Sequence, residues 1–181
     1  YESKSNINKI NQIYIAKVKK NLLFFDVGSP PKKKYSKYYQ SGPLSFEYFI
    51  DNNKIITNCG FGNKISKEAK LLSRLTSAQS TLCLNDTSVV KFERNNLIND
   101  AFGAAITTSF KVSDLNIDDN KDYLVLSAEH NAYENNFNYK HKRIIRIDKK
   151  KSNLFGEDSL ISVNKNHKIQ NVVKSITYRK T

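Results

Sequence analysis

The sequence predicts an all-β protein, specifically a two-layer antiparallel β-sandwich. Three observations support this: many short runs rich in β-branched and aromatic residues, turn-forming residues between those runs, and little helical periodicity. A length of 181 residues suits one domain whose core is large enough to fold without cross-links. About ten strands at this spacing are typical of sandwiches and related large antiparallel sheets.

The predicted strands follow one another along the whole chain. They are residues 12–18, 22–27, 44–50, 54–59, 80–84, 88–92, 104–112, 123–128, 139–148 and 172–178. Clusters of Gly, Pro, Asn, Asp and Ser separate many of them, and such clusters favour turns. The Asp-Asn-Asn sequence at 51–53 predicts a hairpin loop.

Two stretches carry some helical character. Residues 5–20 place isoleucines at near-helical spacing, but isoleucine and tyrosine cluster near the middle, so we expect extended chain. Residues 64–77 are expected to form one or two helical turns, with Ala69, Leu71 and Leu72 facing inward, or else a loop.

Composition excludes several classes of protein. Hydrophobic residues make up 39% and charged residues 26%, which is not the composition of a disordered chain. Two cysteines, Cys59 and Cys83, are too few for a disulfide framework or a four-thiolate zinc site. We expect them to be small buried hydrophobes that face each other across strands. The sequence contains no apolar run long enough to span a bilayer and no signal-peptide pattern.

The charge is strongly positive, with 30 Lys and Arg against 17 Asp and Glu, a net +13. Such a balance favours polyanionic partners. However, 25 of the 30 cations are lysine and 22 residues are asparagine, a bias that an AT-rich genome also produces. Both explanations stay open at this point. The scarcity of arginine counts against sequence-reading nucleic-acid binders.

Chemistry-bearing residues are few, and no phosphate-binding glycine loop, nucleophile elbow or CxxC pair is present. The most crowded polar segment contains His130, Tyr133, His141 and Arg143. Residues two apart on a strand share a face, so His141 and Arg143 would present two nitrogen groups together, suited to a carboxylate or sulfate. The alternative is a solvated edge strand whose charges deter aggregation.

Three segments together resemble the C-terminal β-domain of heparinase II/III-like polysaccharide lyases. The first spans 25–31, 40–47 and 55–60, with Gly-Pro-Leu-Ser-Phe-Glu at its centre. The second is Arg-Leu-Thr-Ser-Ala-Gln-Ser-Thr from Arg74, similar to Arg-x-Thr-Ala-Ala-His-Ser-Thr in the family. The third, from His130, is similar to His-Asp-Gly-Tyr, an intervening Phe, His-Arg-Arg and Gly-Glu-Asp.

The resemblance implies an enzyme that cleaves uronate-containing anionic glycans by β-elimination. Such chemistry needs groups that neutralise the uronate carboxylate and a Tyr or His as base and acid. In the family these come largely from an N-terminal α/α toroid, so residues 1–181 are expected to form one β-sandwich domain, the C-terminal part of a longer, secreted or periplasmic bacterial protein, inactive when isolated. The implied catalytic residues are His130, Tyr133 and His141, and the implied substrate-binding residues are Gln40, Arg74, Gln79 and Arg143.

The sequence departs from the family where metal-binding members have zinc ligands. Gln40, Asn58 and Gln79 stand where those members have His, Asp and His. Amides are poor zinc ligands, so no metal or other cofactor is expected, and the three side chains are expected to form a hydrogen-bonded cluster. Two alternatives to a lyase domain are a non-catalytic anionic-glycan binding module and, ranked last, a nucleic-acid binder. The expected partners are therefore an anionic polysaccharide and the toroid, with no nucleic acid.

Overall fold

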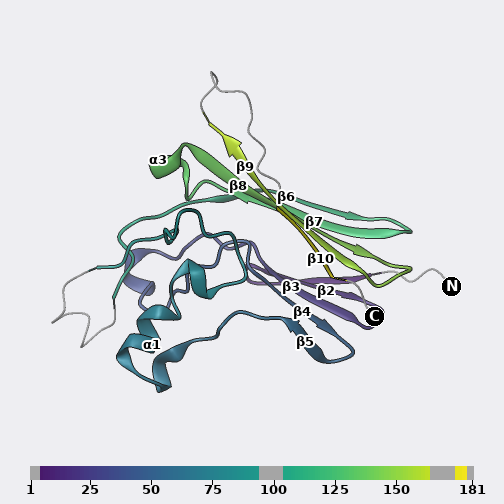
Figure 1. The fold of residues 1–181 in the computed structure, drawn as a ribbon, viewed down its shortest axis with the longest axis horizontal. Coiled ribbons are helices and arrows are strands. Elements are labelled where there is room, and N and C mark those ends of the chain that lie inside the picture. The colour runs from purple at the N-terminus through teal and green to yellow at the C-terminus, as the bar shows by residue number, and fades with distance from the viewer. Residues whose placement is uncertain (1–4, 94–103, 164–173, 179–181) are drawn as a thin grey trace.

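The computed structural model describes residues 5–93, 104–163 and 174–178, in which two five-stranded antiparallel sheets face each other (Figure 1). The first sheet consists, in spatial order, of β1 (Asn6–Ile10), β2 (Ile13–Val18), β3 (Asn21–Asp26), β4 (Phe46–Ile50) and β5 (Asn53–Ile56). The second consists of β6 (Val112–Asp119), β7 (Tyr123–His130), β8 (Tyr139–Asp148), β9 (Leu154–Ser162) and β10 (Lys174–Tyr178). Every strand pairs with its neighbours in the chain, so each sheet is a meander. The predicted two-layer β-sandwich is confirmed.

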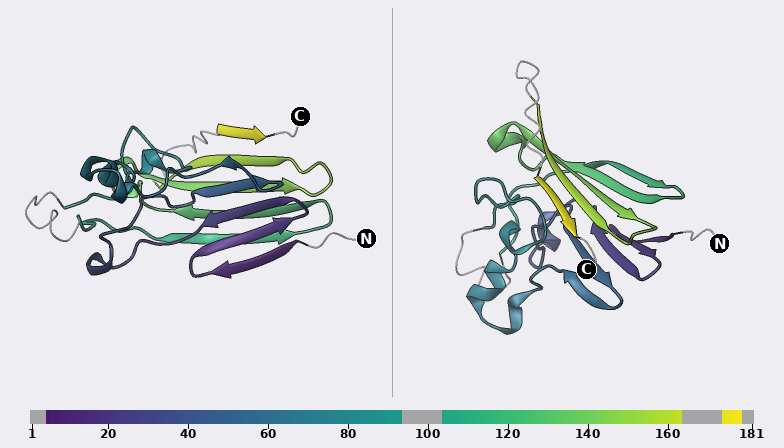
Figure 2. Two further views of the ribbon diagram at one scale, coloured as in Figure 1. Left: turned by 90° about the horizontal axis from the view of Figure 1, so that it is seen from below. Right: turned by 45° about the vertical axis from the view of Figure 1, so that its right-hand side comes forward.

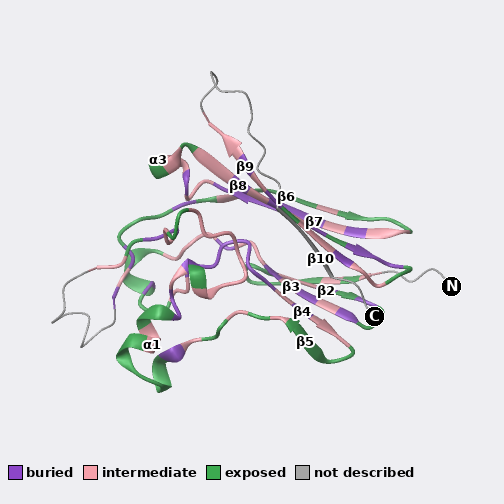
Figure 3. Ribbon diagram, in the orientation of Figure 1, coloured by how far each residue is buried: buried purple, intermediate pink, exposed green. Residues whose placement is uncertain are grey.

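The core lies between the two sheets. Inward positions alternate along the strands, as in β3, where Leu23 and Phe25 are buried and Phe24 is only half-buried (Figure 3). In the second sheet, Leu124 and Leu126 of β7 are buried and the residue between them is half-buried. Burying these apolar faces stabilises the sandwich by roughly 25 cal/mol per Å².

Short polar turns join the strands of the first sheet. The expected hairpin at 51–53 is confirmed, because β4 and β5 pair on either side of Asp51 and Asn52. Both residues have positive φ angles, 50° and 67°, which Asp and Asn tolerate better than most side chains. Residues 5–20 are extended as expected and form β1 and β2, joined through Asn11 at φ 54°.

Three predicted strands are not strands. Residues 80–84, 88–92 and 104–111 form only two isolated bridges, Leu84 with Thr87 and Phe92 with Ile106. The amide of Thr107 donates to the carbonyl of Lys91, but several other backbone groups bond to side chains. The amide of Lys91, for example, donates to the Thr108 hydroxyl, and the amide of Ile106 donates to Ser36 Oγ.

β6 and β9 were not predicted as strands, and β1 was expected only as extended chain. β1 and β6 each have one strand neighbour and are largely exposed, so their sequences carry many Asn, Asp and Lys and little hydrophobic alternation. β9 contains Gly156, Glu157 and Asp158, which are typical of a turn. The last predicted strand, 172–178, is seen as β10, and its first two residues lie outside the described residues.

The long connections of the first half gather at one end of the sandwich (Figures 1 and 2). They include the short 3₁₀ turns η1 (Lys33–Tyr35), η2 (Gly62–Lys64) and η3 (Thr76–Ala78), and the helix α1 (Lys67–Leu72). Ser66 caps α1 by accepting a hydrogen bond from the amide of Ala69. A Cβ atom at position 62 would lie 2.5 Å from the carbonyl oxygen of Ala69, so the packing of η2 against α1 requires Gly62.

Two expectations for this region are wrong. Leu71 and Leu72 do not face inward but are 47% and 59% exposed. Cys59 is exposed and Cys83 is half-buried, and both are free thiols, so they do not form a buried pair. Helix in the described part is otherwise limited to a second short element, α3 (Glu134–Phe137). None of the described helices combines the length and apolar character that a bilayer crossing requires.

Candidate functional site

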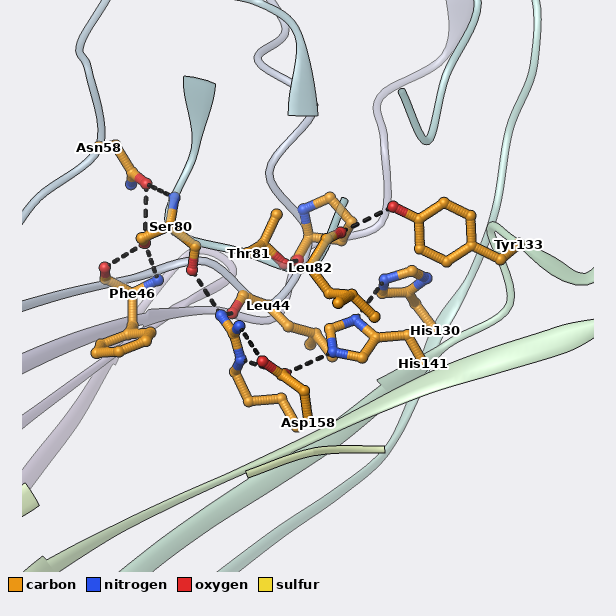
Figure 4. A network of polar contacts seen from close by, with 12 residues as sticks. Leu44, Phe46, Asn58, Ser80, Thr81, Leu82, His130, Tyr133, His141 and Asp158 are labelled. Carbon is orange, nitrogen blue, oxygen red and sulfur yellow. Dashed lines mark hydrogen bonds and ion pairs between the residues drawn. The ribbon is translucent and has the colours of Figure 1, made fainter. Parts of the chain in front are cut away.

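A buried polar network lies on the inner face of the second sheet, and strand register creates it (Figure 4). His130 of β7 pairs with His141 of β8, and Arg143 of β8 pairs with Asp158 of β9. His141 and Arg143 are two residues apart, so both point inward. Both imidazoles are fully buried, and Arg143 and Asp158 are nearly so.

Hydrogen bonds fix the protonation state of both imidazoles. The backbone amide of Ala132 donates to Nδ1 of His130, so that nitrogen is an acceptor. At the other end, Nε2 of His141 lies 2.7 Å from a carboxylate oxygen of Asp158, so it is a donor. The remaining contact, 3.0 Å between Nε2 of His130 and Nδ1 of His141, then runs from His130 to His141. Both rings are therefore neutral and carry their proton on Nε2.

Electrostatics favours the same neutral state. Burial lowers the pKa of His130 well below its ordinary value, and the neighbouring His141 and Arg143 lower it further. Burial also lowers the pKa of His141, an effect that the Asp158 carboxylate only partly offsets. A second proton on either ring would place two N–H groups against each other or against the Ala132 amide.

Arg143 joins the two layers of the sandwich. Its Nε and one Nη atom bind both oxygens of Asp158 at 2.7 Å, a bidentate ion pair. The other Nη atom donates to the carbonyl oxygens of Leu44 and Ser80, which belong to the loops of the first half. Burial alone would raise the pKa of Asp158, but hydrogen bonds from His141 and Arg143 and their charges hold it well below its usual range.

Tyr133 and Arg74 anchor loops in the same way. The Tyr133 hydroxyl donates to the carbonyl oxygen of Leu82 and accepts from the amide of Leu84, and burial raises the pKa of the phenol. Arg74 is 1% exposed and donates to three backbone carbonyls, those of Ser36, Tyr39 and Ala104. Burial lowers its pKa to about 10.

The structure thus brings together His130, His141 and Arg143, with the Tyr133 ring 5.6 Å from that of His130. Arg74 belongs to a separate set of hydrogen bonds. All five side chains are buried and bonded to protein groups, so none presents a free polar face to a substrate in this conformation. The sequence interpretation did not include Asp158 among the site residues. The signal for it was the Gly-Glu-Asp motif that carried part of the family resemblance.

The predicted amide residues, by contrast, line an open pocket of about 280 Å³ at the loop end of the first sheet. Gln40, Asn58 and Gln79 share its wall with two carboxylates, Asp26 and Glu47, and with apolar side chains such as Phe24 and Phe46. Gln40 and Gln79 both donate to the carbonyl oxygen of Ser73, at 3.3 and 2.8 Å.

The expected amide cluster is therefore present only in part. The two glutamines meet at Ser73, whereas the oxygen of Asn58 accepts hydrogen bonds from the amide and hydroxyl of Ser80. Asn58 lies close to Glu47, because the backbone amide of Asn58 donates a 3.1 Å hydrogen bond to the Glu47 carboxylate. Asp26 and Glu47 were not identified from the sequence, although Glu47 ends the Leu-Ser-Phe-Glu segment.

Asp26 is the most perturbed acid of the pocket. Burial raises its pKa to about 6, although the Gly28 amide donates a 2.8 Å hydrogen bond to the carboxylate and opposes the shift. The pocket therefore presents two carboxyl groups and three amides, and its walls contain neither lysine nor arginine among the described residues.

These residues do not fit a zinc ion. The amide nitrogens of Gln40 and Gln79 already donate to Ser73, and amide oxygens lack the charge and nitrogen donors that zinc prefers. Within the described ranges, no group of three His, Cys, Asp or Glu side chains is arranged so that it could hold a metal ion.

Comparison with protein families identifies the chain. The model of the family "Heparinase II/III-like, C-terminal" matches residues 6–175. The match covers almost the whole sequence, so the chain belongs to this family, as its motifs predicted. Searches of curated proteins and of solved structures found no match.

Proposed function

We propose that this chain is the C-terminal β-sandwich of a polysaccharide lyase that cleaves uronate-containing anionic glycans by β-elimination. The observation that carries the proposal is the family match over residues 6–175. In this proposal the domain forms one wall of the substrate cleft, and an N-terminal helical toroid of the same parent chain supplies the main base and acid.

Within the domain, the proposal assigns substrate contact to Gln40 and Gln79, because both line an open pocket. Contact by Arg74 and Arg143, and catalysis by His130, Tyr133 and His141, would require the covering loops to open. Such opening would first break the hydrogen bonds to Leu44 and Leu82 that hold those loops.

The burial of those side chains favours a second candidate function, a non-catalytic module that binds anionic glycan. In this case the domain retains the fold of a lyase but contributes only attraction and positioning. Its net charge of +13 supplies long-range attraction to a polyanion.

Absorbance of the unsaturated uronate product separates the two functions. We expect the isolated chain to produce no signal from heparin, heparan sulfate or alginate, and the parent protein to produce one with its preferred glycan. A signal from the isolated chain would place the base and acid in this domain. A parent protein that binds these glycans but never produces the signal would favour the binding module.

A further inference from the structure

A surface rich in lysine and aromatic side chains lies at the loop end of the sandwich. We define this lysine–aromatic surface by its members, Lys34, Tyr35, Lys37, Tyr38, Phe61 and Lys70. They come from η1, the chain that follows it, the residue before η2, and α1. Tyr35 and Tyr38 are 67% and 57% exposed, among the largest exposures of any aromatic side chain in the described part. The ribbon of α1 is likewise largely exposed (Figure 3).

Side chains of the surface contact both tyrosine rings. The Tyr38 ring packs edge-on against Phe61, with centroids 5.9 Å apart. The ammonium groups of Lys37 and Lys70 lie 5.1 and 5.7 Å from the centre of the Tyr38 ring. The ammonium group of Lys34 lies 4.7 Å from the centre of the Tyr35 ring. The Tyr38 ring, which packs on Phe61, therefore loses little conformational freedom when a ligand packs on it.

Among the described residues, no acid neutralises the lysines of this surface. In the described part of the chain, Lys34, Lys37 and Lys70 form no ion pair, whereas neighbouring Lys33 is paired with Glu93. The acid on α1, Glu68, accepts hydrogen bonds from its own backbone amide and from Ser66, and these lower its pKa. Three cations therefore remain available beside two exposed aromatic rings.

This combination of groups is complementary to an acidic sugar. Aromatic faces pack against the C–H faces of a pyranose ring, and lysine ammonium groups bind its carboxylate or sulfate. The neighbouring pocket cannot take the anionic group, because Asp26 and Glu47 line it. The surface lies close to that pocket, since Gln40 of the pocket donates to the carbonyl of Gly60, next to Phe61.

We propose that the lysine–aromatic surface binds an acidic polysaccharide, with sugar rings packed on Tyr35 and Tyr38 and acidic groups on the surrounding lysines. The inference rests on the proposed function, because it locates the glycan of that function on this domain. The surface contains no arginine, the side chain that pairs best with bases and phosphates, so a nucleic acid is the less favoured ligand.

The test is binding of size-defined heparin and alginate oligosaccharides to the whole chain at low salt. One variant carries Lys34→Gln, Lys37→Gln and Lys70→Gln. Its matched control carries Lys9→Gln, Lys17→Gln and Lys54→Gln, three exposed lysines of the first sheet, so both have the same net charge. We expect about tenfold weaker binding for the first and less than about threefold for the control.

A third variant, Tyr35→Ala with Tyr38→Ala, keeps the charge and should weaken binding about fivefold without changing its salt dependence. Far-UV circular dichroism and melting curves check that all variants fold. Equal losses in the two lysine variants would overturn the assignment to this surface. Absence of binding by the unmodified chain at low salt would also overturn this inference, whereas the proposed function is tested separately by the uronate product of the parent protein. Tighter binding of single-stranded DNA, lost in the same variants, would overturn the glycan in favour of nucleic acid.

Discussion

Two polar regions of this sandwich differ in how fully their groups are satisfied. In the buried network, His130, His141, Arg143 and Asp158 all bond to protein groups between the sheets. In the open pocket, Gln40 and Gln79 use their amide nitrogens on Ser73, while the pocket that they line remains open. A network whose polar groups are all hydrogen-bonded can hold the two sheets together. A polar pocket with free volume can bind a ligand.

The comparison shows that a polar motif in a sequence does not reveal which of these roles it has. His130 and His141 looked like candidate acids and bases, yet their register places them against each other in the core. Gln40 and Gln79 stand where metal-binding members of the family have histidine ligands, yet here they line the open pocket.

Removal of Arg143 should have the largest effect on stability. Arg143→Met leaves the buried Asp158 carboxylate without its bidentate partner and leaves the Leu44 and Ser80 carbonyls without a donor. We expect a loss of about 3–5 kcal/mol in the free energy of unfolding, measured by urea denaturation.

Arg146→Met provides the matched control. Arg146 lies on the same strand but is exposed, with its guanidinium over the Tyr123 and Phe155 rings at 5.0 and 4.8 Å. Its loss should cost less than about 1 kcal/mol. Similar costs for the two variants would mean that Arg143 does not join the layers.

Acid should weaken the buried network next. Both histidines have a lower pKa in the folded chain than in the unfolded one, so the unfolded state takes up protons first as the pH falls below about 6.5. Between pH 7 and pH 5 this costs about 2 kcal/mol for each ring that stays neutral.

Imidazole nitrogen chemical shifts measured at pH 5 check this directly. We expect both rings to be neutral, with the proton on Nε2. Titration of either ring near pH 6.5 would show that it is accessible to water and would weaken the distinction between the two regions.

Much of the fold was predictable from the sequence, because inward residues of β3 and β8 alternate with outward ones and turns separate the strands. The errors lie where this rule fails. Residues 80–84 look like a strand but are held by the Tyr133 hydroxyl, a contact across 51 positions of sequence. The family motifs pointed to Gln40, Asn58 and Gln79, but these residues come to one pocket through loops whose paths no local pattern specifies.

A substitution at Asp26 tests whether the pocket destabilises an ionised carboxylate. The pKa of Asp26 is about 6 in the folded chain against an ordinary 3.8, so its contribution to stability is lost as the pH rises through that interval. Asp26→Asn keeps the acceptor for the Gly28 amide and should stabilise the chain by about 1–2 kcal/mol at pH 7.5, with no gain at pH 4.

The same substitution at Asp158 should have the opposite sign, because the pKa of that carboxyl lies below its usual range. Denaturation curves at pH 4 and pH 7.5 for the two variants measure both effects. A loss of stability in Asp26→Asn at pH 7.5 would mean that the ionised carboxylate makes a favourable contact in the pocket.

The smallest effect is expected from metal removal. Gln40, Asn58 and Gln79 line one pocket, but amides do not replace two imidazoles and a carboxylate as zinc ligands. Treatment of the unmodified chain with EDTA should leave the melting temperature within about 1 °C of its original value, and elemental analysis should find well under one zinc per chain.

The combined variant Gln40→His, Asn58→Asp and Gln79→His places charged and nitrogen donors at the same three positions. It should bind zinc and melt at a lower temperature after EDTA, whereas alanine at all three positions should do neither. Stoichiometric zinc in the unmodified chain would mean that other donors complete a site there, and the open pocket would then be a metal centre.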